Sequence, residues 1–116
     1  MKIEMLKSKI HRATVTGADL DYVGSVSIDP ALCEAVGLRE WEKVDVLDID
    51  NGARLTTYVI FGQPGEVCLN GAAARLIHKG DRVIIVAYAQ FNSEEAATHR
   101  PRVVMVDDSN RVTSTC

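Results

Sequence analysis

The chain has 116 residues, of which 47% are hydrophobic and 25% are charged, and this length suits one domain around one hydrophobic core. Its 13 basic and 16 acidic residues give a formal charge of −3, which argues against a nucleic-acid binder that depends on a broad basic surface. The N-terminal segment alternates charged and apolar residues and lacks the apolar run of a signal peptide or membrane span. We therefore expect a soluble, cytoplasmic protein with a single domain over residues 1–116.

The first strand with a clear alternating pattern is DYVGSVSID, residues 21–29. Alternate residues from Tyr22 to Ile28 would share one face, which is typical of a half-buried strand. Glycine weakens the interior of a strand, so Gly24 indicates a bend or a close approach to the backbone. From these residues alone, a bend explains the Gly24–Ser25 pair more simply than chemistry does.

A short helix is predicted directly after this strand. It would run from about residue 30 to residue 36, with Asp29 available as the N-cap and Gly37 as the stop signal. The small-residue segment over residues 72–77 is the second helix candidate. Helices are therefore expected to be few and short.

The clearest local pattern is VDVLDIDNGARLTTYVIF, residues 44–61, in which two strand-like runs flank Asn51 and Gly52. This pair suits the positive backbone dihedrals of a type I′ hairpin turn. Two further strands are predicted: DRVIIVAYAQF, residues 81–91, as a largely buried strand, and RPRVVMVDD, residues 100–108. Several short strands with few helices favour a small β-barrel.

The cysteine and histidine residues form no recognisable metal or disulfide pattern. Cys33, Cys68 and Cys116 are odd in number and widely separated, and the three histidines are equally scattered. We therefore expect neither a disulfide framework nor a metal site.

Three motifs occur in order along almost the whole chain: KIHRATVTGADLDYVGS at residues 9–25, NGARLTTY at 51–58 and NGAAA at 70–74. Together they resemble the bacterial pyruvoyl-dependent aspartate 1-decarboxylases. The resemblance implies a mainly β fold, a small double-psi β-barrel, and a homotetramer with active sites at subunit interfaces. It also implies conversion of L-aspartate to β-alanine and carbon dioxide, which supplies pantothenate and coenzyme A synthesis. An accessory maturation factor is a candidate partner, whereas nucleic acid and membranes are not.

The resemblance gives the Gly24–Ser25 pair a chemical role. The bond between these residues would cleave itself: the Ser25 hydroxyl attacks the Gly24 carbonyl, and elimination and hydrolysis leave a pyruvoyl group at the new N-terminus. Gly24 has no side chain to crowd this attack. The pyruvoyl group would form a Schiff base with aspartate and accept electrons, so neither pyridoxal phosphate nor a metal is expected.

The resemblance also assigns residues to the aspartate substrate. Arg54 is the candidate for binding a carboxylate, because a planar guanidinium can donate two parallel hydrogen bonds. Lys9 matches a second cationic position, and its division of labour with Arg54 stays open. Tyr58 matches the proton donor to the former α-carbon, since a phenol with a pKa of about 10 stays protonated at neutral pH.

The other matched positions have roles in maturation or in shaping the site. Thr57 matches the residue that hydrogen-bonds the scissile carbonyl during self-cleavage and also contacts substrate. The remaining positions are the substrate-contacting Gly71, Ala72 and Ala73 and the supporting His11, Tyr22 and Asn70.

Simpler interpretations exist for the same side chains. Without the resemblance, Arg54 is a solvated charge after a hairpin, Lys9 and His11 are a solvent-facing pair on a strand, and Tyr58 is an ordinary strand aromatic. In a regular strand Thr57 and Tyr58 would also face opposite sides. Either a bulge or a site shared across a subunit interface would reconcile their roles, and we favour the interface.

The alternative function is a non-catalytic dimeric β-barrel binding module, such as a transcriptional regulator. The acidic charge balance weakens this alternative. A denaturing gel would separate the two hypotheses, because only the self-cleaving enzyme yields two fragments.

Overall fold

The computed structural model describes residues 1–115, and Cys116 lies outside the described residues. None of the helices in the described part is long and apolar enough to span a membrane. Cys33 and Cys68 are free thiols. The elements in chain order are β1 (Lys2–Thr14), β2 (Gly17–Asp19), β3 (Ser25–Ile28), α1 (Pro30–Val36), β4 (Lys43–Asp48), β5 (Arg54–Phe61), β6 (Val67–Asn70), a 3-10 helix η1 (Gly71–Arg75), β7 (Arg82–Asn92), α2 (Ser93–Thr98), β8 (Arg102–Val106) and β9 (Val112–Thr115).

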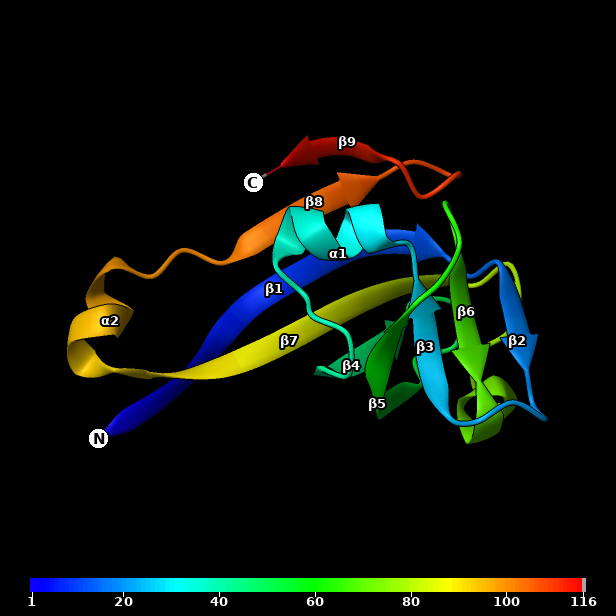
Figure 1. Ribbon diagram of the computed structural model, residues 1–116, viewed down its shortest axis with the longest axis horizontal. Helices are drawn as coiled ribbons and strands as arrows, with labels where there is room; N and C mark the ends of the chain where they lie inside the picture. The colour runs from blue at the N-terminus through cyan, green and yellow to red at the C-terminus, as the bar shows by residue number, and fades with distance from the viewer. Residues whose placement is uncertain (116) are drawn as a thin grey trace.

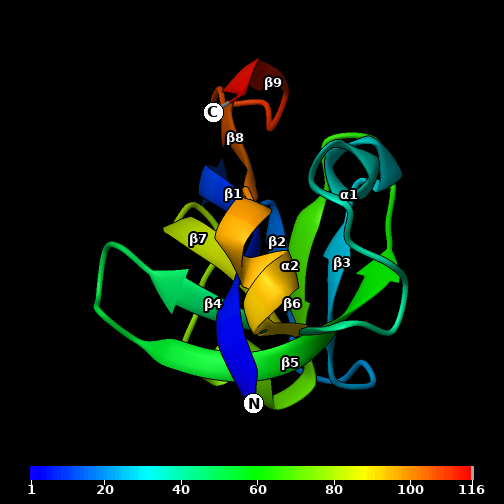
Figure 2. The same ribbon diagram turned by 90° about the vertical axis from the view of Figure 1, so that its left-hand side faces the viewer.

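The strands form one mixed sheet in the order β2-β6-β3-β5-β4-β7-β1-β8-β9. Three of its pairings are parallel, β1 with β8, β2 with β6 and β3 with β5, so strands far apart in the sequence lie side by side. The sheet curls around the core, and α1 lies across one open side (Figures 1 and 2). The largest fully buried side chains are Ile10, Ile28, Leu32, Leu69, Ile77 and Ile85, and buried valines pack with them. This arrangement confirms the predicted mainly β class and suits a small β-barrel.

The long strands β1 and β7 extend beyond this body as an arm. They pair antiparallel from Lys2 with Asn92 at the tip to Thr14 with Arg82 in the body. The tip carries the N-terminus and α2 (Figure 1). The predicted burial of residues 81–91 is therefore right for the body half, where Val83 and Ile85 are fully buried, and wrong for the exposed outer half.

The strand predicted over residues 21–29 is shorter and more deeply buried than expected. β3 begins only at Ser25, residues 21–24 form an exposed turn, and all four residues of β3 are buried. The predicted half-buried alternation was wrong: β3 is an interior strand between β5 and β6, and side chains on both of its faces are buried. The Gly24–Ser25 bond thus joins an exposed loop to a buried strand.

The local signals around α1 are confirmed. The helix spans Pro30–Val36, the Asp29 side chain accepts a hydrogen bond from the Ala31 N–H at 2.8 Å, and Gly37 ends the helix with φ of 76°. The second helix candidate forms only the 3-10 helix Gly71–Arg75. It begins where φ of 70° at Gly71 turns the chain out of β6.

The predicted hairpin is present as β4 and β5, but its turn differs from type I′. That turn needs positive φ at both central residues, whereas Gly52 has φ of 78° and Asn51 is not among the positive-φ residues. The loop spans residues 49–53 and is closed by the Gly52 N–H donating to the Asp48 carbonyl at 2.9 Å. The Asp48 side chain makes the longer loop possible, since its Oδ1 accepts from the Asp50 and Asn51 N–H groups.

Candidate functional site

The Ser25 hydroxyl is held in place at the start of β3. Ser25 is only 2% exposed and pairs with Asn70 across β3 and β6. The Asn70 side-chain amide donates to Ser25 Oγ at 2.9 Å and to Ser27 Oγ at 3.0 Å. Ser25 Oγ in turn donates weakly to the Val23 carbonyl at 3.3 Å. A buried hydroxyl is thus positioned directly beside the exposed Gly24.

Gly71 packs against the same peptide. A Cβ atom placed on Gly71 would lie 2.8 Å from Gly24 Cα and 3.0 Å from Gly24 N, closer than real Cβ contacts. The positive φ of Gly71 also favours glycine. The backbone of the small-residue loop therefore defines where the Gly24–Ser25 bond lies.

A pocket of about 380 Å³ opens beside Gly24. Its wall comes from β5, from the end of β6 and from the small-residue loop. β5 reaches the pocket because it pairs in parallel with β3. In this pairing Val26 lies opposite Val59, so the preceding residues, Ser25 and Tyr58, lie side by side. The lining residues are Gly24, Leu55, Thr56, Thr57, Tyr58, Asn70, Ala72, Ala73 and Leu76.

Thr57 and Tyr58 both line this pocket although they are neighbours on one strand. The ladder between β4 and β5 is regular from Arg54 to Tyr58, so the bulge considered from the sequence is absent there. Tyr58 stacks on Trp41, with ring centroids 5.9 Å apart and an interplanar angle of 28°. Sequence reasoning missed Trp41, although its being the only tryptophan of the chain was a usable signal.

The predicted cationic residues do not line the pocket of a single chain. Lys9 lies on β1, which is three strands away from β5 in the sheet, between Val86 and Val103. Arg54 is exposed and lines a separate recess with Asp45. Within residues 1–115 neither cation forms an ion pair. One chain therefore offers the pocket no positive side chain from its described residues.

The two aromatic supporting residues also lie outside the pocket lining. His11 is on β1, and burial together with the Lys9 and Arg12 charges lowers its pKa, so its ring is neutral at pH 7. Tyr22 is exposed in the turn before Gly24, with its carbonyl beside Gly71. The structure thus brings Gly24, Thr57, Tyr58, Asn70, Ala72 and Ala73 together and leaves Lys9, His11, Tyr22 and Arg54 apart from them.

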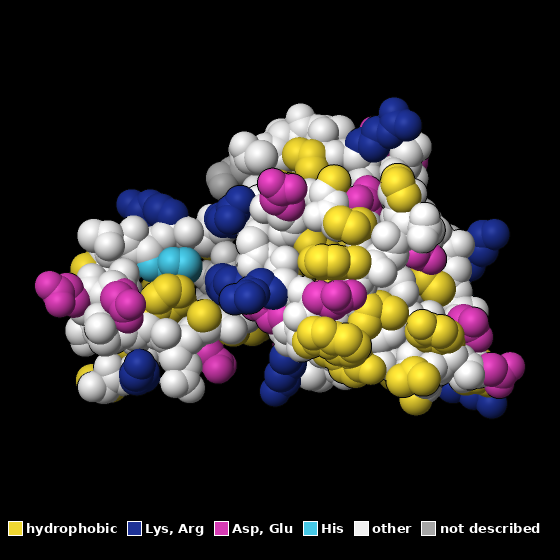
Figure 3. Space-filling model, in the orientation of Figure 1, with side chains coloured by type: hydrophobic (Ala, Val, Ile, Leu, Met, Phe, Trp, Pro, Cys, Tyr) yellow, Lys and Arg dark blue, Asp and Glu magenta, His cyan; other side chains and the backbone are white. Residues whose placement is uncertain are grey.

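Large apolar side chains are exposed around this site. Val23 is 73% exposed and Trp41 is 70% exposed, and Leu76 on the pocket rim is also exposed. Hydrophobic side chains gather over the body of the molecule on the face in Figure 3, and fewer lie over the arm. Such a distribution is typical of a surface that contacts another protein.

Comparison with known proteins gives one consistent family. The family model described as Aspartate decarboxylase matches residues 1–113. The Aspartate 1-decarboxylase of Lactiplantibacillus plantarum is 60% identical over 115 residues, which cover 97% of this chain and 88% of the relative. That of Clostridium beijerinckii is 59% identical over 114 residues, with 97% and 92% covered. That of Sulfurimonas denitrificans is 56% identical over 114 residues, with 97% and 94% covered.

Proposed function

Because the chain belongs to the aspartate decarboxylase family, we propose that it decarboxylates L-aspartate with a pyruvoyl group made from its own Ser25. The chain is an enzyme that converts L-aspartate to β-alanine and carbon dioxide, and β-alanine serves pantothenate and coenzyme A synthesis. The non-catalytic binding module is set aside by the named relatives. We further propose that residues 1–116 act as one self-cleaving domain in the cytoplasm.

The residues around the Gly24–Ser25 bond suit the formation of this group. The observation that carries the proposal is the fixed Ser25 hydroxyl, which Asn70 holds at 2.9 Å on the boundary between loop and strand. The pocket reaches Gly24, so a new N-terminus at residue 25 would face open space beside Tyr58. The exposed turn over residues 21–24 can move away after cleavage, because no strand pairing holds it.

Maturation would proceed through three balanced changes. Ser25 Oγ bonds to the Gly24 carbonyl carbon while the Gly24–Ser25 C–N bond breaks, and the hydroxyl proton goes to the freed amine. Removal of the Ser25 α-proton then expels Gly24 as a carboxylic acid, which takes up that proton, and leaves a dehydroalanine; one water finally releases ammonia and leaves the ketone. A serine hydroxyl is a weak nucleophile, so alignment by Asn70 and polarisation of the carbonyl by Thr57 would supply the acceleration.

The mature group supplies an electron sink for the pair of electrons that carbon dioxide leaves behind. Tyr58 would hold the proton that the former α-carbon receives. Its ring is oriented by the stack on Trp41 and by its place on β5 beside Ser25. Ala72 and Ala73 keep the opposite wall small enough to leave room for the substrate.

A second subunit would complete the site. Aspartate carries two carboxylates, and no cationic side chain from residues 1–115 lines the pocket of one chain. Lys9 and Arg54 have no ion-pair partner within those residues and are available to a neighbouring subunit's pocket. The exposed Val23 and Trp41 would be covered in the same contact. These features support a homotetramer with shared sites, in which an accessory factor could promote maturation.

The pyruvoyl proposal is tested by trapping the carbonyl group. Purified mature protein is expected to release carbon dioxide from L-aspartate without added pyridoxal phosphate, and to lose this activity in proportion to hydrazine labelling. Intact-mass measurement should place the adduct on the fragment that begins at residue 25. Full activity after complete labelling would exclude the pyruvoyl mechanism, and an adduct absent from that fragment would exclude Ser25 as its source.

Arg54→Ala is expected to separate substrate binding from self-cleavage. A lost hydrogen bond to a charged group costs about 1.5–3 kcal/mol, so kcat/KM for aspartate should fall roughly ten- to a hundredfold. Cleavage should continue, because Arg54 lies outside the pocket that contains Gly24. Steady-state kinetics on fully cleaved protein measure the effect, and unchanged kinetics would contradict the assigned role.

Subunit mixing tests whether Arg54 acts across an interface. Co-expression of Arg54→Ala with Ser25→Ala should produce assemblies in which some sites combine an intact Arg54 from one chain with an intact Ser25 from another. Activity well above that of either variant alone is expected if the site is shared. If the mixed assembly is no more active than the Arg54→Ala chains it contains would be by themselves, then Arg54 and Ser25 act in the site of the same chain.

A further inference from the structure

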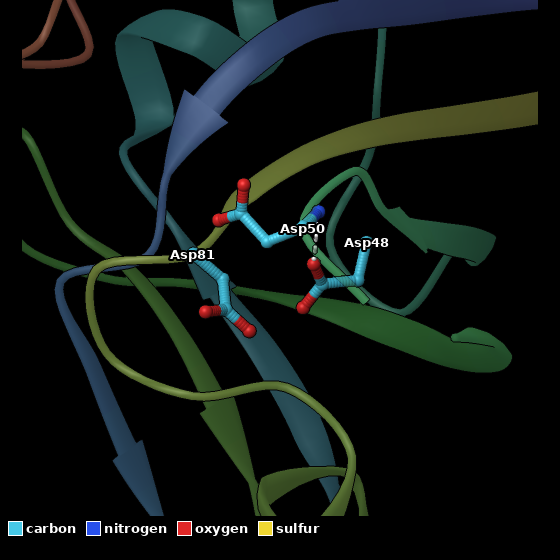
Figure 4. A group of neighbouring side chains, drawn as sticks. All are labelled: Asp48, Asp50 and Asp81. Carbon is cyan, nitrogen blue, oxygen red and sulfur yellow. Dashed lines mark hydrogen bonds between the residues drawn. The ribbon is translucent and has the colours of Figure 1, made fainter. Parts of the chain in front are cut away.

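Three aspartates from two distant segments lie close together beside the β4–β5 hairpin loop. Asp48 ends β4, Asp50 lies in the loop that follows, and Asp81 directly precedes β7. Each offers one carboxylate oxygen, and these oxygens all lie within 4.8 Å of one another (Figure 4). The sequence analysis considered only histidine and cysteine as ligands and therefore missed this group.

Backbone N–H groups hold each of the three carboxylates by one oxygen. Asp48 Oδ1 accepts from the Asp50 N–H at 2.8 Å, and Asp50 Oδ2 accepts from the Arg82 N–H at 2.9 Å. Asp81 Oδ2 accepts from the His78 N–H at 3.0 Å. One oxygen on each side chain is thus anchored, which orients the carboxylates before any ligand arrives.

The remaining oxygen of Asp48 lacks a partner. Asp48 is only 3% exposed, and its Oδ2 is buried without a hydrogen bond from any described residue. In Figure 4 the Asp48 carboxylate faces that of Asp81. A buried carboxylate oxygen beside a second carboxylate needs a positive partner, either a bound cation or a proton shared between the two carboxylates.

The neighbouring basic side chains do not supply that partner. Arg82 forms its ion pair with Asp108. The His78 ring is 63% exposed and comes only within 3.9 Å of Asp81, away from the buried Asp48 oxygen. No described basic side chain therefore pairs with the buried Asp48 oxygen.

We propose that Asp48, Asp50 and Asp81 bind a hard divalent cation, with calcium as the best match. All three ligands are carboxylate oxygens, which suit calcium and magnesium rather than zinc or copper. Calcium accepts Ca–O distances of about 2.3–2.6 Å in variable geometry, whereas magnesium demands a near-ideal octahedron at about 2.0–2.1 Å. Ligands that come from a loop and a separate turn fit the variable geometry of calcium more easily than a strict octahedron. Water would complete the coordination.

Such a cation would brace one wall of the pocket. It would tie the loop over residues 49–53 to the turn before β7. In the same loop, the Asn51 side-chain amide donates to the Leu76 carbonyl at 2.8 Å, and Leu76 lines the pocket. None of the three aspartates lines the pocket, so occupancy of the site is expected to affect stability first.

Calcium titration of the purified assembly tests the proposal. Protein is treated with EDTA, dialysed, and then titrated with calcium chloride in a calorimeter at constant ionic strength, with magnesium chloride as the comparison. Saturable heat is expected with calcium and weaker heat with magnesium. At roughly tenfold excess of calcium over its Kd, the melting midpoint should rise by about 4 °C or more.

Asp48→Asn and Asp81→Asn are the informative variants. Asparagine keeps an oxygen that can accept the backbone hydrogen bond, and its amide can satisfy the facing carboxylate, so both variants should fold. Their calcium heat and melting shift should disappear. Glu94→Gln removes an exposed charge on α2 at the tip of the arm (Figure 1) and should respond like wild type. If wild type gives no calcium response, a proton shared between Asp48 and Asp81 explains their contact and the proposal is overturned. An undiminished response in Asp48→Asn would overturn it equally.

Discussion

Replacing Ser25 with alanine is expected to leave a full-length, uncut chain without decarboxylase activity. Alanine removes the oxygen that would attack the Gly24 carbonyl, so no pyruvoyl group can form. The fold should survive, because the Asn70 amide keeps its hydrogen bond to Ser27 Oγ at 3.0 Å when Ser25 Oγ is lost. Loss of one such hydrogen bond costs about 1 kcal/mol. Intact-mass spectrometry follows cleavage, and light scattering follows assembly.

Ser27→Ala is the matched control for this experiment. Ser27 is buried on the same strand and bonds the same Asn70 amide, but it is not part of the scissile bond. This variant should still cleave at Gly24–Ser25 and lose a comparable amount of stability. Cleavage at the same bond in Ser25→Ala would refute the proposed chemistry. Equal loss of cleavage in both variants would assign Ser25 a structural role.

Gly71→Ala is expected to slow self-cleavage by about a hundredfold or more, because misplacement of reacting groups by about 1 Å has an effect of that size. The new Cβ would lie 2.8 Å from Gly24 Cα and 3.1 Å from the Tyr22 carbonyl oxygen. These contacts are with backbone, which cannot rotate away, so the Gly24–Ser25 bond must shift relative to Asn70. The fraction of cut chain against time, measured on freshly purified protein, gives the rate.

Gly52→Ala separates this contact from ordinary backbone strain. Gly52 has φ of 78°, close to the 70° of Gly71, but a Cβ at Gly52 would meet no atom within 4 Å. Both variants should lose about 1–2 kcal/mol of unfolding free energy through the left-handed conformation. Only Gly71→Ala should also lose cleavage. Similar cleavage rates in the two variants would show that the close approach of Gly71 does not control the scissile bond.

Elements that depend only on neighbouring residues could be predicted from the sequence. Asp29 and Gly37 mark the two ends of α1, because an N-cap and a left-handed residue after the helix each act within one helical turn. The β4–β5 hairpin could be predicted for the same reason, since its strands flank one short loop. α2 also carried a local signal that was overlooked, a capping box formed by Asn92 and Glu95.

The candidate site was predictable in part. The motifs around Gly24–Ser25, Thr57–Tyr58 and Asn70–Ala73 gave the residues that meet at the pocket, but nothing local predicted that they would meet. The parallel pairing of β3 with β5 and the antiparallel pairing of β3 with β6 bring them together. Each pairing joins segments more than 30 residues apart in the sequence.

Burial, close approach and charge balance depend instead on how distant segments pack together. Alternation predicted a half-buried strand at β3, but its neighbours on both sides left all four residues buried. Gly71 touches Gly24, and Asp48 meets Asp81, through contacts that no local pattern records. Lys9 stays outside the pocket because β1 lies three strands from β5 in the sheet, whereas Arg54 lies at the start of β5 itself and lines a different recess. Local signals fix backbone conformation over a few residues, whereas the burial of each side chain depends on every strand packed against it.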